Sequence, residues 1–358
     1  MSAVATLPVV DLRDTPVVTI DLDIMDANIR RLQAYCDAHG IANRPHIKTH
    51  KIPAIAKHQL REGAAGITCQ KLGEVAIMLD AGITDILVTY NILGDAKLHR
   101  LREMAGRPGA RLIVACDNGV VVRALSEAFA GAPAPLSVVV ECDTGTGRTG
   151  TQTPAETVEL AQVIAGLPGL RFEGLMTYPI TNETGTFFEA TLARLERVGL
   201  RPRVVSTGGT PAYRRAHEVP GVTEHRAGTY VFNDRATVAS GAATWDDCAM
   251  RIRTTVISRP TPDRAIIDAG SKTLSSDLLG QVGHGHIVEY PDAVIQRLNE
   301  EHGIVDLTRC QAKPEVGEIV SVIPNHTCVV TNLHDALVGV RKGRVEVVWP
   351  VAARGLVR

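Results

Sequence analysis

Eight short apolar runs alternate with amphipathic stretches through the first two thirds of the chain, and this alternation most strongly limits its fold. Amphipathic stretches such as "KLGEVAIMLDAG" and "PAETVELAQVIAG" have helical spacing and end at glycine. Strands that alternate with helices form a parallel sheet, and eight such repeats predict a closed (β/α)8 barrel of the TIM type. The runs are "NRPHIK", "GITC", "DILVTY", "RLIVAC", "SVVVEC", "FEGLMTY", "RVVSTG" and "TEHRAGTYV".

An open, doubly wound sheet is the alternative architecture. The sequence disfavours it because no G-x-G-x-x-G pattern follows an early strand. A further strand, "TPVVTIDL", and a helix over residues 23–38 are expected before the first barrel repeat.

The pattern changes near Trp245. Strand-like segments follow, among them "AMRIRTTVIS", "RAIIDAG", "GEIVSVIP" and "TCVVTNL", and "RKGR" is typical of a hairpin turn. The sequence therefore predicts a barrel domain over residues 17–244 and a second, mostly β domain over residues 245–358. Residues 1–16 are a candidate addition to the second domain.

The composition of the chain argues against nucleic acids and membranes as its binding partners. Lys and Arg number 38 against 39 Asp and Glu, and this balance of charge argues against nucleic acid as the main partner. No window approaches the roughly 18 consecutive apolar residues of a membrane span, and no signal peptide is recognised, so no membrane partner is expected. The seven cysteines are widely spaced without a CxxC, which favours buried free thiols in a cytoplasmic protein for all but Cys328.

The stretch "NRPHIKTHK" places Lys48 near the C-terminal end of the first predicted barrel strand, the end at which barrel enzymes carry their chemistry. A lysine there can form a Schiff base with an aldehyde when its surroundings lower its pKa. Lys51 is expected to start the following helix and to be exposed. The alternative, that both lysines are surface residues, stays open on this stretch alone.

Two small-residue turns follow the last two barrel strands, "STGGT" at residues 206–210 and "RAGTY" at residues 226–230. Backbone N–H groups in such turns suit a phosphate, and late barrel strands commonly provide this kind of site. A lysine together with a phosphate cup indicates pyridoxal phosphate (PLP). The loop "ECDTGTGRTG" adds an acidic pair, Glu141 and Asp143, and Arg148 as candidate contacts to the cofactor ring or the substrate carboxylate. The alternative is a glycine-rich loop with a solvated arginine.

The segment "PNHTCVV" places His326 and Cys328 two residues apart in a predicted strand, so that both point to one face. Imidazole and thiolate suit Zn²⁺, with water or substrate completing the coordination shell. The alternative is a buried cysteine beside a hydrogen-bonded histidine. His302 in "EEHG" is a further acid–base candidate.

Together, these segments resemble the D-threonine aldolase / D-serine dehydratase family, fold-type III PLP enzymes related to alanine racemase. The resemblance covers nearly the whole chain. It implies a PLP-binding barrel, a β domain, a homodimer and a D-amino acid substrate. Its motifs are "RPHIKTHK", "GITCQKLGEVAIMLDAGITDIL", "STGGTP", "EHRAGTYVFND", "IIDAGSKTLSSD", "EEHG" and "IPNHTCVVTNLHD".

The resemblance also implies roles for single residues. Lys48 would be the covalent anchor of PLP, Tyr178 would lie near the pyridine nitrogen and Arg148 near the ring hydroxyl. His326 and Cys328 would bind a divalent metal, zinc in the first place, with manganese or magnesium as alternatives. The other cofactor contacts would be Gln70, Thr207, Gly208, Gly209, Gly228, Thr229 and Tyr230.

The implied activity is a PLP- and metal-dependent lyase of β-hydroxy D-amino acids, with aldolase-like cleavage to glycine and an aldehyde. Alternatives are dehydratase-type elimination to a 2-oxo acid and ammonia, a racemase, and a PLP-binding protein without turnover. The His-x-Cys pair resembles the dehydratases, whereas the C-terminal segment resembles the aldolases. The aldolases carry a histidine after the tyrosine matched by Tyr178, but "YPITNETGTFFE" has none. Aldol cleavage would then need His302 or metal-bound hydroxide as the base.

Overall fold

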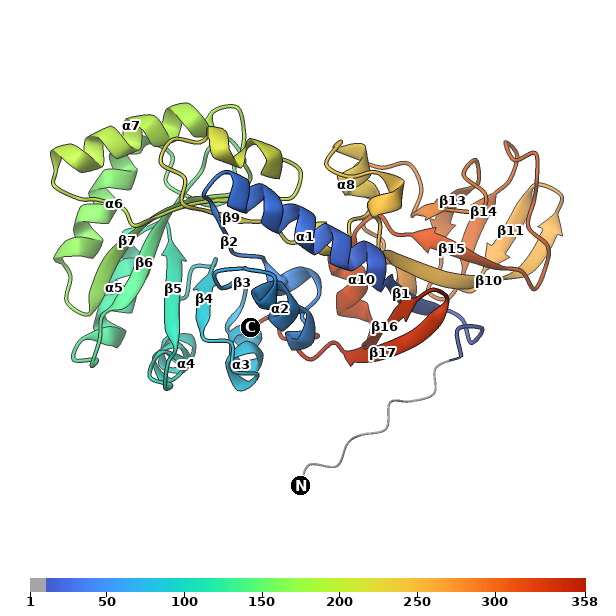
Figure 1. The fold of residues 1–358 in the computed structure, drawn as a ribbon, viewed down its shortest axis with the longest axis horizontal. Coiled ribbons are helices and arrows are strands. Elements are labelled where there is room, and N and C mark those ends of the chain that lie inside the picture. Colours follow the sequence, from blue (N-terminus) through green and yellow to red (C-terminus); the bar gives the residue numbers. More distant parts are fainter. Residues whose placement is uncertain (1–10) are drawn as a thin grey trace, which may run out of the picture. The chain divides into compact units, whose positions relative to one another are not determined.

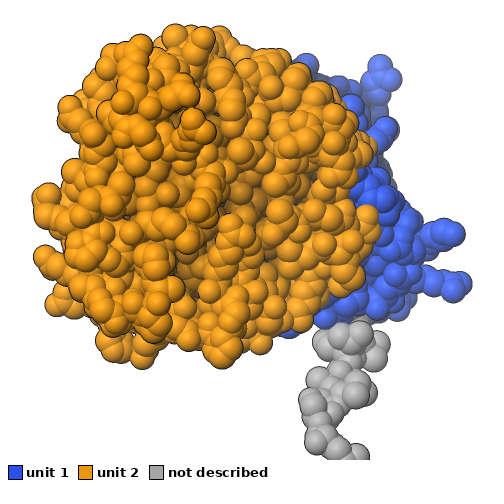
Figure 2. All heavy atoms as spheres, turned by 60° about the vertical axis from the view of Figure 1, so that its left-hand side comes forward, with its two compact units in different colours: residues 1–30, 49–52, 229–354 blue, residues 31–48, 53–228, 355–358 orange. Residues whose placement is uncertain are grey.

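The computed structural model describes residues 11–358, which fall into two compact units (Figure 2). The chain passes from one unit to the other at residues 30/31, 48/49, 52/53, 228/229 and 354/355, so each unit is assembled from several segments. The domain limits at 17–244 and 245–358 stay a prediction, and part of the segment 1–16 lies outside the described residues. Of the described residues, unit 1 contains 11–30, 49–52 and 229–354, and unit 2 contains 31–48, 53–228 and 355–358.

Unit 2 contains an eight-stranded parallel sheet in the order β2-β9-β8-β7-β6-β5-β4-β3 (Figure 1). A parallel bridge between His46 and Thr68, and a 2.8 Å bond from the Thr68 N–H to the Pro45 carbonyl, join its two edges. The predicted barrel and its eight strands are thereby confirmed. The strands are β2 (Ala42–Asn43), β3 (Ile67–Cys69), β4 (Asp85–Val88), β5 (Arg111–Cys116), β6 (Leu136–Cys142), β7 (Leu170–Thr177), β8 (Val204–Gly208) and β9 (Glu224–Arg226).

Helices connect successive barrel strands, as the amphipathic spacing predicts. Asn118 and Thr153 cap two of them: Asn118 accepts hydrogen bonds from two N–H groups of the first turn, and Thr153 accepts one. The connecting helices are α2 (Pro53–Arg61), α3 (Leu72–Asp80), α4 (Asp95–Ala105), α5 (Gly119–Phe129), α6 (Pro154–Gly166), α7 (Thr184–Arg197) and the 3-10 helix η2 (Tyr213–Glu218). No helix within residues 11–358 is long and apolar enough to cross a bilayer.

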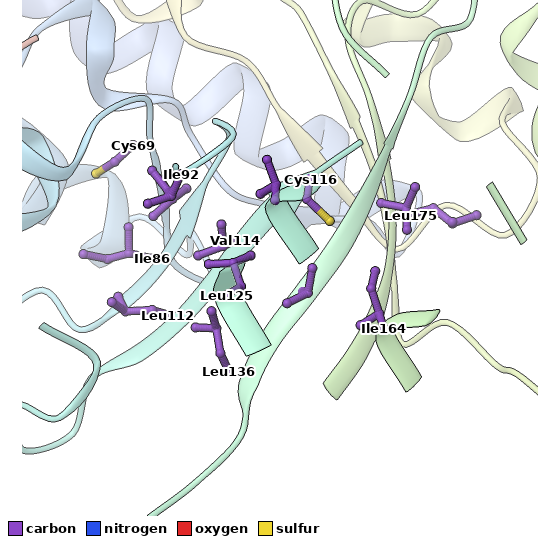
Figure 3. Close-up of a cluster of buried hydrophobic side chains, with 14 of the residues drawn as sticks. Cys69, Ile86, Ile92, Leu112, Val114, Cys116, Leu125, Leu136, Ile164 and Leu175 are labelled. Carbon is purple, nitrogen blue, oxygen red and sulfur yellow. The ribbon is translucent and has the colours of Figure 1, made fainter. Parts of the chain in front are cut away.

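Alternate residues of β4, β5, β6, β7 and β8 enter two different cores, because successive side chains of a strand point to opposite faces. Leu87, Ile113 and Met176 belong to a small inner cluster. Ile86, Leu112, Val114, Cys116, Leu136 and Leu175 belong to a larger cluster that also includes the helix residues Leu125 and Ile164 (Figure 3). Six of the seven cysteines are buried free thiols, as predicted, and Cys328 is partly exposed.

Unit 1 is built on a mostly antiparallel sheet with the path β13-β14-β11-β10-β1-β16-β17, and β15 pairs with both β10 and β12. The predicted hairpin is confirmed, with Lys342 and Gly343 at positive φ in its turn. The strands are β1 (Val17–Asp21), β10 (Met250–Thr261), β11 (Arg264–Ile267), β12 (His286–Ile287), β13 (Val294–Leu298), β14 (Gly303–Asp306), β15 (Ile319–Ile323), β16 (Ala336–Arg341) and β17 (Arg344–Pro350). The helices are the first part of α1 (Leu22–Ala38), η3 (Thr229–Val231), α8 (Arg235–Ala239), η4 (Trp245–Asp247), α9 (Ser271–Leu274) and α10 (Thr327–Leu333).

Gly174 permits the close approach of β7 and β8. A Cβ atom at this position would overlap the backbone carbonyl of Val204, which cannot move without disturbing the sheet. We expect Gly174→Ala to lower the free energy of unfolding by about 3 kcal/mol, measured by urea denaturation. Gly166→Ala is the matched control, because nothing lies within 4 Å of the added Cβ at the end of α6. Equal stability of the two variants would contradict the described strand packing.

Candidate active site

Lys48 lies directly after the first barrel strand, in the short 3-10 helix η1 (Ile47–Thr49). The strand continues past β2 as far as His46, whose N–H donates to the Ala227 carbonyl at 2.9 Å. The Lys48 side chain is half-buried. The structure thus places Lys48 where the sequence predicts it, at the C-terminal end of the barrel.

His46 links Lys48 to Gln70. The Lys48 N–H donates to His46 Nδ1 at 3.4 Å, so Nδ1 is the acceptor nitrogen and Nε2 carries the proton. Nε2 then donates to Gln70 Oε1 at 3.2 Å, and the Gln70 amide donates to the Thr89 carbonyl at 2.7 Å. This chain of bonds fixes the neutral tautomer of His46. Gln70 therefore has a defined orientation beside the predicted anchor.

The Tyr178 ring is the point on which the predicted cofactor residues converge. Lys48 Nζ lies 5.6 Å and Arg148 Cζ 4.9 Å from its centroid. A Cβ atom at Gly208 or Gly209 would lie 3.3 or 3.4 Å from the edge of the ring, so the missing side chains leave this edge open. Residues from four separate strand ends thus meet around one aromatic ring.

The loop that carries Arg148 is organised by Asp143, one of the two acidic residues that the sequence offered as candidate contacts to cofactor or substrate. Its carboxylate accepts hydrogen bonds from the backbone N–H groups of residues 145, 146 and 147, at 2.7–3.0 Å. Those N–H groups are used within the loop, so this glycine-rich turn differs from a phosphate cup. Arg148 lies 3.5 Å from Glu141, whose pKa is raised by burial.

A buried charge, Arg226, contacts the strand ends that precede Tyr178 and Gly208. Arg226 is buried, donates to the Thr177 carbonyl at 2.8 Å and contacts the Ser206 hydroxyl. Burial lowers the pKa of Arg226 to about 10, although Glu224 and Glu141 oppose the shift. The sequence analysis gave Arg226 no role. The signal that could have found it was "EHR", a run of charged residues within a predicted barrel strand, which must place some of them inside the barrel.

The predicted phosphate residues are divided by the structure. Gly208 and Gly209 belong to unit 2 with Gly228, whereas Thr229 and Tyr230 begin the next segment of unit 1. The Thr207 hydroxyl pairs with His225 Nδ1 at 2.9 Å, so in this structure its side chain serves strand packing. A role of this set in phosphate binding stays a prediction.

His326 and Cys328 stand at the start of a helix, not in the predicted strand. His326 is the N-cap of α10, and Cys328 is its second residue. Local β-branched residues favour a strand, but buried Asp234 accepts hydrogen bonds from the Thr327 N–H at 3.1 Å and its hydroxyl at 3.3 Å. This contact starts the helix and brings the two predicted ligands together. The strand prediction for "TCVVTNL" was wrong.

Both predicted metal ligands have hydrogen-bond partners within unit 1. His326 Nδ1 lies 2.7 Å from Asp277 Oδ2, and Cys328 Sγ lies 3.2 Å from the hydroxyl of Thr49, the residue after Lys48. Burial lowers the pKa of His326, but Cys328, Asp277 and Asp234 outweigh it and raise the pKa to about 9. No group of three or more His, Cys, Asp or Glu side chains within residues 11–358 is arranged to hold a metal. The donor pair nevertheless has the chemistry of a zinc site with open positions.

Two further residues singled out from the sequence are His302, which is exposed, and Lys51, which is buried. His302 is exposed in the turn between β13 and β14, where its carbonyl accepts a bond from Asn299, and its acid–base role stays a prediction. The expectation for Lys51 was wrong. Lys51 is buried at positive φ, its ammonium donates to the Ala353 carbonyl at 3.4 Å, and α2 begins only at Pro53.

Comparison with known proteins identifies the family. Residues 20–236 match the model of the alanine racemase N-terminal domain, and residues 249–340 match that of a putative serine dehydratase domain. A D-threonine aldolase from Arthrobacter sp. is 35% identical over 96% of this chain and 94% of its own. The chain belongs to the D-threonine aldolase / D-serine dehydratase family of fold-type III PLP enzymes.

Solved structures agree with this assignment. The crystal structure of D-threonine aldolase from Filomicrobium marinum has a TM-score of 0.88 and 33% identity, covering 96% of this chain and 97% of its own. A cysteine-to-alanine mutant of D-threo-3-hydroxyaspartate dehydratase from Delftia sp. HT23, solved in the metal-free form, has a TM-score of 0.84 and 30% identity. It covers 95% of this chain and 98% of its own.

Proposed function

We propose that the protein is a PLP-dependent lyase that cleaves β-hydroxy D-amino acids in the manner of a D-threonine aldolase. One observation carries the proposal, namely the convergence of Lys48, Arg148, Gly208 and Gly209 on the Tyr178 ring. These residues fit PLP: an amine for its aldehyde, a flat aromatic neighbour, and a turn without side chains for its phosphate. When bound, PLP supplies an electron sink for bonds broken at Cα.

The chain's own residues would prepare this site. His46 and Gln70 hold the segment of Lys48 at the strand end, and Asp143 holds the loop that brings Arg148 over Tyr178. The Arg148 guanidinium over Tyr178 would attract the anionic cofactor and the substrate carboxylate. Binding and orientation would thus be built into the barrel end before substrate arrives.

We further propose that His326 and Cys328 hold a divalent metal ion, zinc in the first place. Their donor types support this, as does the metal-free form of the cysteine mutant in the related dehydratase. Such an ion supplies a Lewis acid for the β-hydroxyl of a substrate. A homodimer and a cytoplasmic location are proposed on the family resemblance and on the buried thiols alone.

Elimination to a 2-oxo acid and ammonia is the second candidate. The His-x-Cys pair favours it, and so does the segment after Tyr178, where Thr181 and Thr184 hydrogen-bond to Thr144 in place of a histidine. Their hydroxyl groups have no basicity comparable to an imidazole near neutral pH. The missing histidine therefore bears on which products form. PLP and the metal are needed by both candidate reactions and do not separate them.

A substrate screen separates the two candidates. The purified protein, loaded with PLP and Zn²⁺, is given D-threonine, D-serine or 3-hydroxy-D-aspartate. Aldehyde and glycine, or 2-oxo acid and ammonia, are then measured for each substrate. We expect aldehyde and glycine from D-threonine and 3-hydroxy-D-aspartate. Formation of 2-oxo acid alone would replace the aldolase assignment with the dehydratase, and absence of turnover would contradict both.

A further inference from the structure

We propose that Asp277 is a positioning residue that orients His326 toward the metal ion. The inference rests on the proposed metal site and adds a residue that is neither a metal ligand nor a cofactor contact. Asp277 Oδ2 lies 2.7 Å from His326 Nδ1, in a pair with side-chain exposures of 35% and 26%. The two residues lie 49 positions apart in the chain, so the contact is made by the fold.

The contact selects one tautomer of His326. An ionised carboxylate only accepts hydrogen bonds, so Nδ1 must carry the proton in the 2.7 Å contact. The neutral ring then presents the lone pair of Nε2, which is the form that binds a metal. Cys328 is two residues further along, in the first turn of the helix that His326 caps. Asp277 thus sets which nitrogen of His326 is left to bind a metal.

The backbone holds Asp277 in place independently of its carboxylate. The Asn325 amide donates to the carbonyls of Asp277 at 3.3 Å and Gly283 at 2.9 Å, and Arg235 donates to Gly283 at 3.2 Å. Asn325 directly precedes His326, so the same residue ties the loop 277–283 to the predicted ligand. Replacing the Asp277 side chain therefore removes the carboxylate while the loop keeps its anchors.

The test is zinc affinity of the PLP-loaded protein, measured by competition with a chromophoric chelator. We expect Asp277→Ala to weaken zinc binding 10–100-fold, the range found for outer partners of metal-binding histidines. Asp277→Asn, which keeps an acceptor oxygen without the charge, should lie between Asp277→Ala and the wild type. Asp292→Asn is the matched control, because it removes an exposed carboxylate of the same unit and should bind zinc as the wild type does.

Two further measurements make the outcomes decisive. The thermal unfolding midpoint of Asp277→Ala should equal that of the wild type, and its His326 should lose the Nδ1–H signal in long-range ¹H–¹⁵N spectra of the metal-free protein. Unchanged zinc affinity in Asp277→Ala would overturn the inference while leaving the metal site intact. Loss as complete as in His326→Ala would make Asp277 a ligand and also overturn it. A wild type that binds no zinc would overturn the metal site itself, and the inference with it.

Discussion

Lys48→Ala is expected to abolish the covalent attachment of PLP and with it the visible absorbance of the purified protein. The amine is the group that condenses with the aldehyde, and no methyl group can replace it. Turnover should fall at least about 10⁴-fold, the scale of loss when other enzymes lose their covalent nucleophile. The measurement combines the absorbance spectrum with mass spectrometry after borohydride reduction, which fixes the cofactor to the lysine that holds it.

Lys57→Ala is the control for this experiment, because Lys57 is exposed on the helix that follows Lys48. Its spectrum and adduct should match those of the wild type. A yellow Lys48→Ala protein with a reducible adduct elsewhere would contradict the anchor assignment. Loss of PLP in both variants would instead indicate that the first barrel segment depends on surface charge for cofactor retention.

The fold at this site could be predicted from sequence because the relevant signals are local. Short apolar strands and amphipathic helices have distinct periods, and parallel strands in a barrel must bring their C-terminal ends together. That geometry suffices to place Lys48, Tyr178 and the turn at Gly208 near one another, although they lie far apart in the chain. The structure confirms this convergence.

The features that the sequence did not reveal depend on contacts between distant residues. α10 begins with β-branched residues that favour a strand, and the buried carboxylate of Asp234, 93 positions away, makes it a helix. Lys51 is buried, and its ammonium donates to the carbonyl of Ala353, 302 positions away. The pairing of Asp277 with His326 likewise has no local pattern. Propensity and spacing contain no information about such partners.

The glycine-rich loop at residues 143–150 shows a second reason why sequence alone did not predict the site. Its composition suited either cofactor or substrate contacts through Arg148 and the acidic pair, or a glycine-rich loop with a solvated arginine. The structure shows that Asp143 accepts the N–H groups of the loop, and this leaves Arg148 directed over Tyr178. Glycine patterns predict exposed N–H groups, but a neighbouring carboxylate decides whether those groups are available to a ligand.

Cys328→Ala is expected to lower zinc affinity more than about 100-fold, because loss of a ligand should exceed the effect of losing an outer partner. Turnover should fall in parallel across a zinc titration, and chelation of the wild type should reproduce the defect, reversed by added Zn²⁺. Cys310→Ala is the matched control, since it removes a buried thiol from the same unit and should leave zinc binding unchanged. PLP absorbance should persist in both variants, because the anchor is Lys48.

This experiment also separates a lyase from a PLP-binding protein without turnover. Such a carrier has no need of an ion, so chelation would change none of its properties. The Thr49 hydroxyl, 3.2 Å from Cys328 Sγ, follows Lys48 directly in the chain, so the same segment carries the predicted anchor and a contact to the predicted ligand. If the metal-free wild type keeps full activity, the ion has no role in turnover. His326 and Cys328 would then serve only the structure at the start of α10.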